Sequence, residues 1–208
     1  MRHTHARRPF AIAILVVVAA CAVVVGAVAV QSASSSAVVQ ALTPGLSSPP
    51  LVEADGQVTA ADGTLPSGGA SVDDAYPGVA NIDADLLAAL REAATDASAR
   101  GIRISITSGW RSAEYQAGLL RDAVSTYGSE AEAARWVATP TTSLHVAGDA
   151  VDIGSYDAMD WLAENGAAYG LCRVYENEPW HFELHDDAGS AGCPPTYRDA
   201  TQDPRLRS

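Results

Sequence analysis

Residues 143–153 read SLHVAGDAVDI, and the fold and the chemistry of the chain are best approached from this stretch. Gly148 permits a sharp turn, and the apolar residues of the run 150–153 predict a short strand. Such a turn can bring the imidazole of His145 and the carboxylate of Asp152 to one point, from a loop and from the strand that follows it. Such a pair alone is more often a structural hydrogen bond than a metal site.

Helical patterns precede this stretch. Asp83 is placed to cap a helix whose leucines and alanines fall on one stripe as far as Gly101. The isoleucines of the run 102–107 alternate with polar residues, which predicts a half-buried strand. A second helix is expected over 112–127. A third is expected over 129–137, because it opens with a capping box.

Strands dominate the part of the chain after residue 153. A helix is predicted from residue 157 to about 168, and two apolar segments, 171–175 and 180–184, are predicted to be strands joined by a turn. Because helices come first and strands last, the sequence predicts an α+β fold. We expect a single compact domain with a small, mainly antiparallel sheet flanked by helices.

Two cysteines, Cys172 and Cys193, lie in this predicted domain. An even pair in an exported domain is most simply a disulfide, and closing this loop would stabilise the fold by roughly 3 kcal/mol. Zinc ligation is the alternative, but neither residue belongs to a Cys-x-x-Cys pair.

The amino-terminal region predicts export. Residues 9–30 contain no charged side chain and are long enough, as a helix, to cross the hydrocarbon core of a bilayer. The basic segment 1–8 precedes them and is expected to stay in the cytoplasm, which places the rest of the chain outside. The run exceeds an ordinary signal h-region, so we favour a transmembrane anchor over a cleaved signal peptide. Lipid attachment at Cys21 is a third interpretation.

Composition divides the rest of the chain. Residues 31–75 are rich in Ser, Ala, Gly and Pro without an apolar period, which predicts a disordered linker. The folded domain is expected over 76–197, followed by a tail over 198–208. Only three of the 25 acidic and three of the 13 basic residues precede residue 71. The domain is therefore strongly acidic, which argues against a nucleic-acid partner.

A second segment supports a metal site. Residues 178–183 read EPWHFE, and His181 offers a further neutral imidazole. Three protein ligands leave a tetrahedral position open for water, which is typical of catalytic zinc. Two imidazoles and a carboxylate suit zinc better than calcium or magnesium. Glu183 shares the face of His181 on the expected strand, where structural support and catalysis are both open to it.

These segments, preceded by Ser108-Gly109-Trp110-Arg111-Ser112, resemble the zinc D-alanyl-D-alanine carboxypeptidases of the VanY type over about residues 76–197. The resemblance implies the fold shared by DD-peptidases and Hedgehog domains. It also implies one zinc ion per chain, with His145, Asp152 and His181 as the ligands and Glu178 as the catalytic base.

The resemblance assigns three further residues. Arg111 polarises the scissile carbonyl and steadies the oxyanion, and it can also contact the substrate. Gln116 and Ser143 match positions that line the substrate pocket. Trp110 stands where Tyr is usual, which leaves the catalytic set intact but puts fine specificity in question.

The expected function is therefore zinc-dependent removal of the terminal D-Ala from peptidoglycan stem peptides. The alternatives are an LD-carboxypeptidase, a D-Ala-D-Ala dipeptidase or an endopeptidase on the same fold, and a non-catalytic wall-binding module. We expect a monomer that is tethered to the cytoplasmic membrane, with its catalytic domain on the extracytoplasmic side. The alternative localisation is a secreted or lipid-anchored form of the chain.

Overall fold

The computed structural model describes residues 57–206. The basic segment 1–8, the expected anchor 9–30 with Cys21, and most of the expected linker lie outside the described residues. Between residues 57 and 206, no helix is long and apolar enough to cross a membrane.

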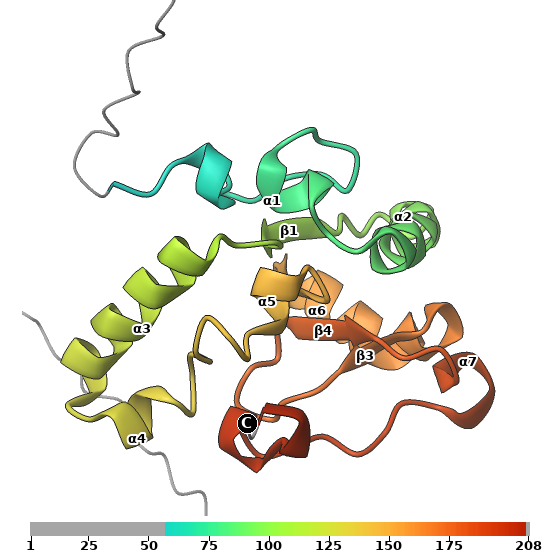
Figure 1. Cartoon of the computed structure of the whole chain (residues 1–208). Helices are drawn as coiled ribbons and strands as arrows, with labels where there is room; N and C mark the ends of the chain where they lie inside the picture. The colour runs from blue at the N-terminus through green and yellow to red at the C-terminus, as the bar shows by residue number, and fades with distance from the viewer. Residues whose placement is uncertain (1–56, 207–208) are drawn as a thin grey trace, which may run out of the picture. The chain divides into compact units, whose positions relative to one another are not determined.

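A four-stranded antiparallel sheet forms the centre of the domain (Figure 1). Its strands lie in the order β1, β2, β4, β3. Their bounds are Ser105–Ser108 for β1, Ala150–Gly154 for β2, Leu171–Arg173 for β3 and His181–Leu184 for β4. The α+β architecture predicted from the sequence is confirmed.

The three longer helices are α2 (Ala84–Ser98), α3 (Ala113–Tyr127) and α6 (Tyr156–Asn165). Helices α2 and α6 pack against the sheet, whereas α3 packs against the short helix α4 (Glu130–Ala133). Asp83 caps α2 as predicted, because its carboxylate accepts hydrogen bonds from the second and third backbone N–H groups of the helix. Gly128 ends α3 in a left-handed conformation at φ 79°. The other short helices are α1 (Pro77–Ala80), α5 (Leu144–Ala147), α7 (Ala188–Ala191), and the 3₁₀ turns η1 (Ala60–Asp62), η2 (Gly166–Tyr169), η3 (Ala200–Gln202) and η4 (Pro204–Leu206).

Two elements are shorter than the sequence predicts. The first strand begins at Ser105 and not at Ile102, because the Ile102 N–H donates to the Ala97 carbonyl and closes the end of α2. The helix expected over 129–137 keeps its Ser129 cap but ends at Ala133. After that residue the backbone continues in turns, in which the Arg135 N–H donates to the Glu132 carbonyl.

The two faces of the sheet differ in chemistry because side chains alternate along each strand. Val151 and Ile153 of β2 and Phe182 of β4 belong to the apolar core, which α2 and α6 cover. The side chains of Asp152 and His181 lie on the opposite face of the sheet. They are directly opposite each other in the β2–β4 register, so two of the expected ligands are cross-strand neighbours.

The packed part of the chain begins before residue 76, inside the stretch assigned to the linker. Ala70 exchanges two backbone hydrogen bonds of 2.8 Å with Ile106 and is buried. A Cβ on Gly63 would lie 2.1 Å from the Trp110 carbonyl oxygen, and one on Gly109 would lie 2.1 Å from the Gly78 oxygen. Glycine thus allows residues 63–78 to pack directly on the backbone that leads to Arg111.

The expected disulfide is present. Cys172 and Cys193 are bonded, which ties β3 to the loop after α7. After this bond the chain returns toward the sheet, and a parallel bridge pairs Tyr197 with Tyr175. The expected tail 198–208 therefore contains packed residues, among them the buried Asp199, Ala200 and Asp203. We call residues 199–206 the C-terminal segment.

Candidate metal centre

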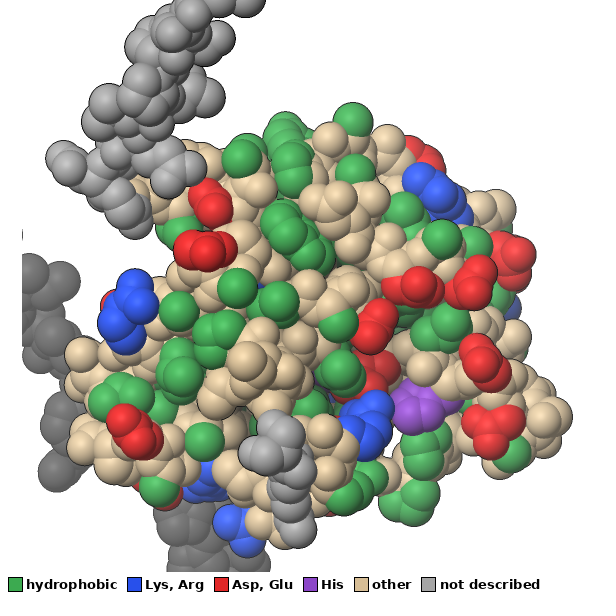
Figure 2. Space-filling model, in the orientation of Figure 1, with side chains coloured by type: hydrophobic (Ala, Val, Ile, Leu, Met, Phe, Trp, Pro, Cys, Tyr) green, Lys and Arg blue, Asp and Glu red, His purple; other side chains and the backbone are tan. Residues whose placement is uncertain are grey.

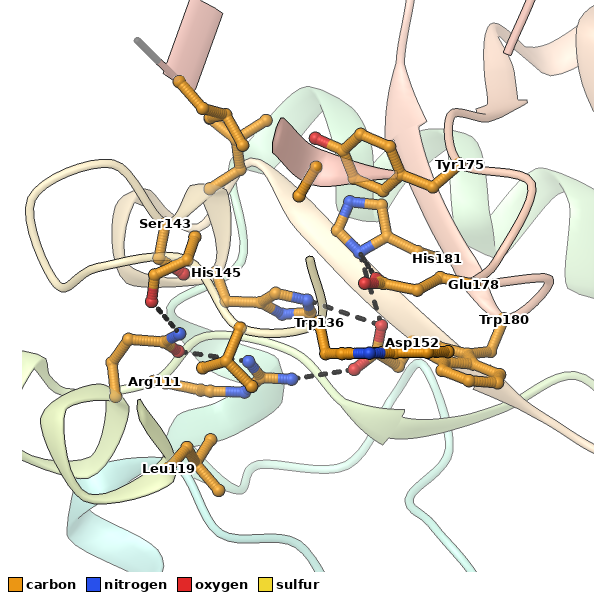
Figure 3. Close-up of a pocket in the computed structure, with 16 residues that line it drawn as sticks. Arg111, Leu119, Trp136, Ser143, His145, Asp152, Tyr175, Glu178, Trp180 and His181 are labelled. Atoms are coloured by element: carbon orange, nitrogen blue, oxygen red, sulfur yellow. Dashed lines mark hydrogen bonds and ion pairs between the residues drawn. The ribbon is translucent and has the colours of Figure 1, made fainter. Parts of the chain in front are cut away.

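The polar face of the sheet lines a cavity of about 250 Å³ (Figure 3). Strands β2 and β4, helix α5, the start of α3, the β3–β4 connection and the C-terminal segment all contribute residues to it. Every residue that the sequence assigned to the site lies in this cavity, namely Arg111, Gln116, Ser143, His145, Asp152, Glu178 and His181.

His145, Asp152 and His181 bring one ligand atom each to a common point, with these atoms within 4.8 Å of one another. Asp152 Oδ1 lies 3.4 Å from His145 Nε2 and 3.4 Å from His181 Nδ1. Ligands about 2.0–2.1 Å from a tetrahedral zinc ion lie about 3.3–3.4 Å from each other. The two separations from Asp152 Oδ1 therefore match those between ligands of a tetrahedral zinc ion.

Hydrogen bonds on the far side of each imidazole fix which nitrogen faces this point. His145 Nδ1 is 2.8 Å from the Gly109 carbonyl oxygen, which can only accept, so Nδ1 donates and Nε2 keeps its lone pair. His181 Nε2 is 3.1 Å from Glu183 Oε1, which leaves Nδ1 to face Asp152. Metal-binding histidines are ordinarily oriented in this way.

Two of the three ligand atoms lack a hydrogen-bond partner. Asp152 Oδ1 and His181 Nδ1 are buried, and neither makes a hydrogen bond within residues 57–206. Orphaned buried polar atoms are costly, whereas a metal ion would satisfy both at once. The residues present therefore fit a zinc ion, which the sequence also predicted.

The pKa values of the three groups follow from burial and from their mutual charges. Burial and the Arg111 guanidinium lower the pKa of His145, so that imidazole is neutral. Burial would raise the pKa of Asp152, but the neighbouring His181 and Arg111 outweigh it and hold the pKa well below its ordinary value. Burial lowers the pKa of His181, but the neighbouring carboxylates of Asp152 and Glu183 outweigh it and raise the pKa to about 9. A metal ion would compete with that proton, as metal binding generally does.

Glu178 lies beside the ligands without joining them. Its Oε2 is 3.8 Å from His181 Nδ1, and the residue is buried. Burial raises the pKa of Glu178 to about 7, which the charge of His181 only partly offsets. A carboxylate whose pKa is near neutrality is suited to accept and return a proton at physiological pH.

Arg111 is held by three side chains. Its Nε donates to Ser108 Oγ over 2.8 Å, Nη1 donates to Gln116 Oε1 over 3.1 Å, and Nη2 donates to Asp152 Oδ2 over 2.8 Å. Asp152 thus turns one oxygen toward the arginine and the other toward the metal position. The remaining guanidinium N–H groups are available to a bound molecule.

Gln116 and Ser143 occupy the cavity in different ways. Gln116 is 1% exposed, and its amide accepts from Arg111 and donates to the Ala138 carbonyl, so it positions the arginine. Ser143 starts helix α5 without capping it, and its side chain is buried at the cavity wall. The amide of Gln116 is thus already engaged within the protein, whereas the Ser143 side chain lines the cavity where a ligand could reach it.

Sequence reasoning missed part of the cavity wall. Trp136, Tyr175 and Trp180 supply aromatic surface, and Ala200 and Leu206 of the C-terminal segment close one side. Trp180 stood inside the motif 178–183 and was available as a signal. The other residues have no spacing relative to the ligands that marks them in the sequence.

The charge of the protein is strongly negative. Figure 2 shows acidic side chains spread over the face in view, with separate arginines between them. The formal net charge of the whole chain is −12.

Comparisons with known proteins agree with the geometry. Residues 80–187 match the VanY D-alanyl-D-alanine carboxypeptidase family model. A D-alanyl-D-alanine carboxypeptidase of Enterococcus faecalis (strain ATCC 700802 / V583) is 33% identical over 111 residues, which cover 41% of this chain and 41% of that protein. The chain thus spans less than half the length of this relative.

Solved structures of similar proteins include a mutant of the vancomycin resistance D,D-pentapeptidase VanY from a VanB-type cassette in complex with Zn(II). It is 30% identical, with a TM-score of 0.47, and the match covers 50% of this chain and 72% of that one. The LdcB LD-carboxypeptidase is 25% identical, with a TM-score of 0.48 and coverage of 62% and 71%. Because the family model matches just over half of the sequence, the chain belongs to the VanY family of D-alanyl-D-alanine carboxypeptidases.

Proposed function

We propose that this chain is a zinc-dependent D-alanyl-D-alanine carboxypeptidase that removes the terminal D-Ala from peptidoglycan stem peptides. One observation carries the proposal: the ligand atoms of His145, Asp152 and His181 converge in a cavity that also holds Glu178 and Arg111. Family membership supports the same reaction class.

Zinc bound by these three side chains would supply Lewis acidity and lower the pKa of a bound water molecule toward 7. The protein contributes a preformed set of ligands. Because Gly109 and Glu183 fix the orientation of both imidazoles, little rearrangement is needed to bind the ion.

Glu178 moves the proton. Its carboxylate accepts a proton from the attacking water and returns it to the amine of the departing D-Ala. Its buried position, with Oε2 3.8 Å from His181 Nδ1, places the carboxylate beside the proposed metal position for both transfers. The burial that raises the pKa of Glu178 also keeps bulk water away from the carboxylate.

Arg111 meets the charge that develops on the scissile carbonyl oxygen. Its guanidinium is fixed by Ser108, Gln116 and Asp152 before substrate binds, so its free N–H groups need no reorganisation during the reaction. The cation also gives an acidic protein a local attraction for the terminal carboxylate of the substrate. Ser143 is the other candidate for that carboxylate.

A cut at a different bond is the second candidate. The cavity of about 250 Å³ has room for a small terminal residue of a stem peptide. An LD-carboxypeptidase on tetrapeptides would use the same ligands and base. A non-catalytic wall-binding module is disfavoured because Glu178 is present and buried beside the ligands.

The proposed setting is the outer side of the cytoplasmic membrane, with residues 9–30 as the anchor and the chain acting as a monomer. The apolar run and the preceding arginines support this placement. Fractionation of the expressing cells, followed by protease treatment of intact spheroplasts, tests it.

The experiment combines metal content with peptide turnover on the detergent-solubilised full-length chain. We expect about one zinc per chain and release of single D-Ala from a pentapeptide stem ending in D-Ala-D-Ala, with loss of activity on chelation and recovery with zinc. Tripeptide and tetrapeptide stems are run in parallel, with mass spectrometry of the products. Zinc without hydrolysis of any stem would contradict the proposal, whereas cleavage of the tetrapeptide alone would favour the LD-carboxypeptidase.

A further inference from the structure

Glu183 lies behind the ligand His181 and is almost completely enclosed. It is 2% exposed, and its Oε1 is 3.1 Å from His181 Nε2, the nitrogen that faces away from the metal position. The two residues share one face of β4 because they are two positions apart. Glu183 therefore sets the orientation of the His181 ring.

The Glu183 carboxylate is itself held by an arginine from the C-terminal segment. Arg205 Nη1 donates to Glu183 Oε2 over 2.7 Å, and Nη2 donates to Oε1 over 3.3 Å. This two-point contact fixes the plane of the carboxylate as well as its position. A buried carboxylate without such a cation is costly and would tend to turn toward solvent.

Asp203 holds Arg205 in turn. Both carboxylate oxygens of Asp203 accept from Arg205, and Asp203 is 0% exposed, whereas the Arg205 side chain is 42% exposed. The hydroxyl of Tyr175 donates to Asp203 Oδ2 over 3.0 Å. The Tyr175 ring lies against the His181 ring, with 5.1 Å between centroids, so this network contacts the ligand from a second side.

The C-terminal segment is fixed at several further points. Tyr197, just before it, exchanges backbone hydrogen bonds of 2.9 Å with Val174 and Glu176. Within the segment, Asp199 accepts a 3.0 Å hydrogen bond from Arg135 Nε. These contacts hold the C-terminal segment in place as one wall of the cavity. The backbone from which the Arg205 side chain extends is therefore fixed.

We propose that Arg205, held by Asp203, is a positioning residue of the metal centre. It keeps the Glu183 carboxylate in the plane that orients His181, so that Nδ1 faces Asp152 and the metal. The C-terminal segment thereby belongs to the metal site, although none of its residues is a ligand. This inference rests on the metal-dependent function proposed above.

The test measures zinc affinity and a spectroscopic signature on the full-length chain, without measuring peptide hydrolysis. Zinc affinity is obtained by competition with a chromophoric chelator. The signature is the proton resonance of His181 Nε2–H in the zinc-loaded protein, which a hydrogen bond to a carboxylate shifts downfield and protects from exchange. The variants are Arg205→Ala, Arg205→Lys and Glu183→Gln, and Arg198→Ala is the control.

Arg198 is a matched control because it lies next to the same segment with a side chain 72% exposed, and its Nε is 3.8 Å from Asp199 Oδ2. We expect Arg205→Ala and Glu183→Gln to weaken zinc binding by about 10-fold or more, as loss of a partner behind a metal ligand does. Lysine lacks the planar fork, so Arg205→Lys should recover only part of the affinity. Arg198→Ala should match the unmodified chain.

Zinc affinity of Arg205→Ala within twofold of the unmodified chain, together with an unchanged His181 resonance, would overturn the inference even if the melting temperature falls. Should Arg205→Ala fail to fold, Arg205→Lys and Glu183→Gln decide by the same criteria. Because no step of this test needs turnover, an unmodified chain that binds zinc without releasing D-Ala contradicts the proposed reaction and leaves the positioning result intact.

Discussion

The two faces of the central sheet show different uses of burial. On β4, Phe182 is fully buried within the apolar core, while its neighbours His181 and Glu183 are buried on the opposite face among charged groups. Apolar contacts on the first face are non-directional and tolerate exchange of similar side chains. On the second face each buried charge depends on a specific partner, so removing one group leaves another unpaired.

The comparison shows how one strand supplies both stability and chemistry. Alternation along β2 and β4 lets the core hold the backbone, while the antiparallel register places Asp152 opposite His181. We therefore expect substitutions on the apolar face to lower stability, and substitutions on the polar face to change metal binding or turnover. The following predictions test this separation.

The largest effect is expected for Glu178→Gln. Loss of the proton acceptor should lower kcat by about 10²–10⁴-fold, while zinc affinity and the melting temperature stay near those of the unmodified chain. Steady-state release of D-Ala measures the effect. Glu176→Gln, an exposed residue of the same connection, is the control. Full activity of Glu178→Gln would refute the assigned base.

Phe182→Ala should instead destabilise the fold. Emptying a fully buried aromatic position is expected to lower the free energy of unfolding by about 3–5 kcal/mol. Urea unfolding followed by circular dichroism gives the value, and Tyr156→Ala, at a residue 79% exposed, is the control. Zinc affinity of the folded fraction should stay within about threefold. A loss of zinc affinity without a loss of stability would show that the two faces are not separable.

Acidification should lower the free energy of unfolding, in part because the buried carboxylate of Asp203 becomes protonated. Burial raises the pKa of Asp203, but hydrogen bonds from Arg205 and Tyr175 outweigh it and hold the pKa below the ordinary value of 3.8. A depressed pKa gives stability that is present above the unfolded-state value and is lost as the pH falls through the folded-state value. We therefore expect the loss to begin near pH 3.8 and to continue below it.

Urea unfolding of the zinc-free chain over a pH series measures this dependence. Asp203→Asn should be less stable at neutral pH and lose less on acidification than the unmodified chain. Asp160→Asn, at an exposed position of α6, should follow the unmodified chain. Equal acid dependence in Asp203→Asn and the unmodified chain would show that this carboxylate contributes nothing to it.

The smallest effect is expected for Asp83→Ala, which belongs to neither face. Its carboxylate caps α2, and its removal should lower the free energy of unfolding by about 1 kcal/mol. Thermal unfolding measures the change, with the exposed Glu92→Ala of the same helix as the control. Zinc affinity should not change. A larger loss would mean that the contact between Asp83 N–H and the Gly148 carbonyl also depends on the cap.

Local signals in the sequence predicted most of the fold. The α2 cap at Asp83, the antiparallel sheet and the Cys172–Cys193 disulfide follow from capping, alternation and cysteine number, all of which act over short distances or simple counts. The bounds of β1 could not be predicted in this way. Where β1 begins depends on its pairing with β2, and Ser105 is the first residue that pairs, opposite Gly154.

The proposed ligand set was also accessible from the sequence, because His145, Asp152 and His181 lie in two compact motifs. The residues that support them were not. Packing of residues 63–78 depends on contacts between backbones, for which composition gives no signal. Arg205 reaches Glu183 from a segment without apolar periodicity, so only the three-dimensional path of the chain reveals the contact.

The position of Arg205 in the chain also bears on biosynthesis. Ribosomes make the amino end first, so the three ligands and Glu183 are synthesised before the arginine that contacts Glu183. A nascent or prematurely terminated chain that stops after β4 contains every ligand but cannot form this ion pair. The charged network behind His181 consequently cannot form before Arg205 has been synthesised and has left the ribosome.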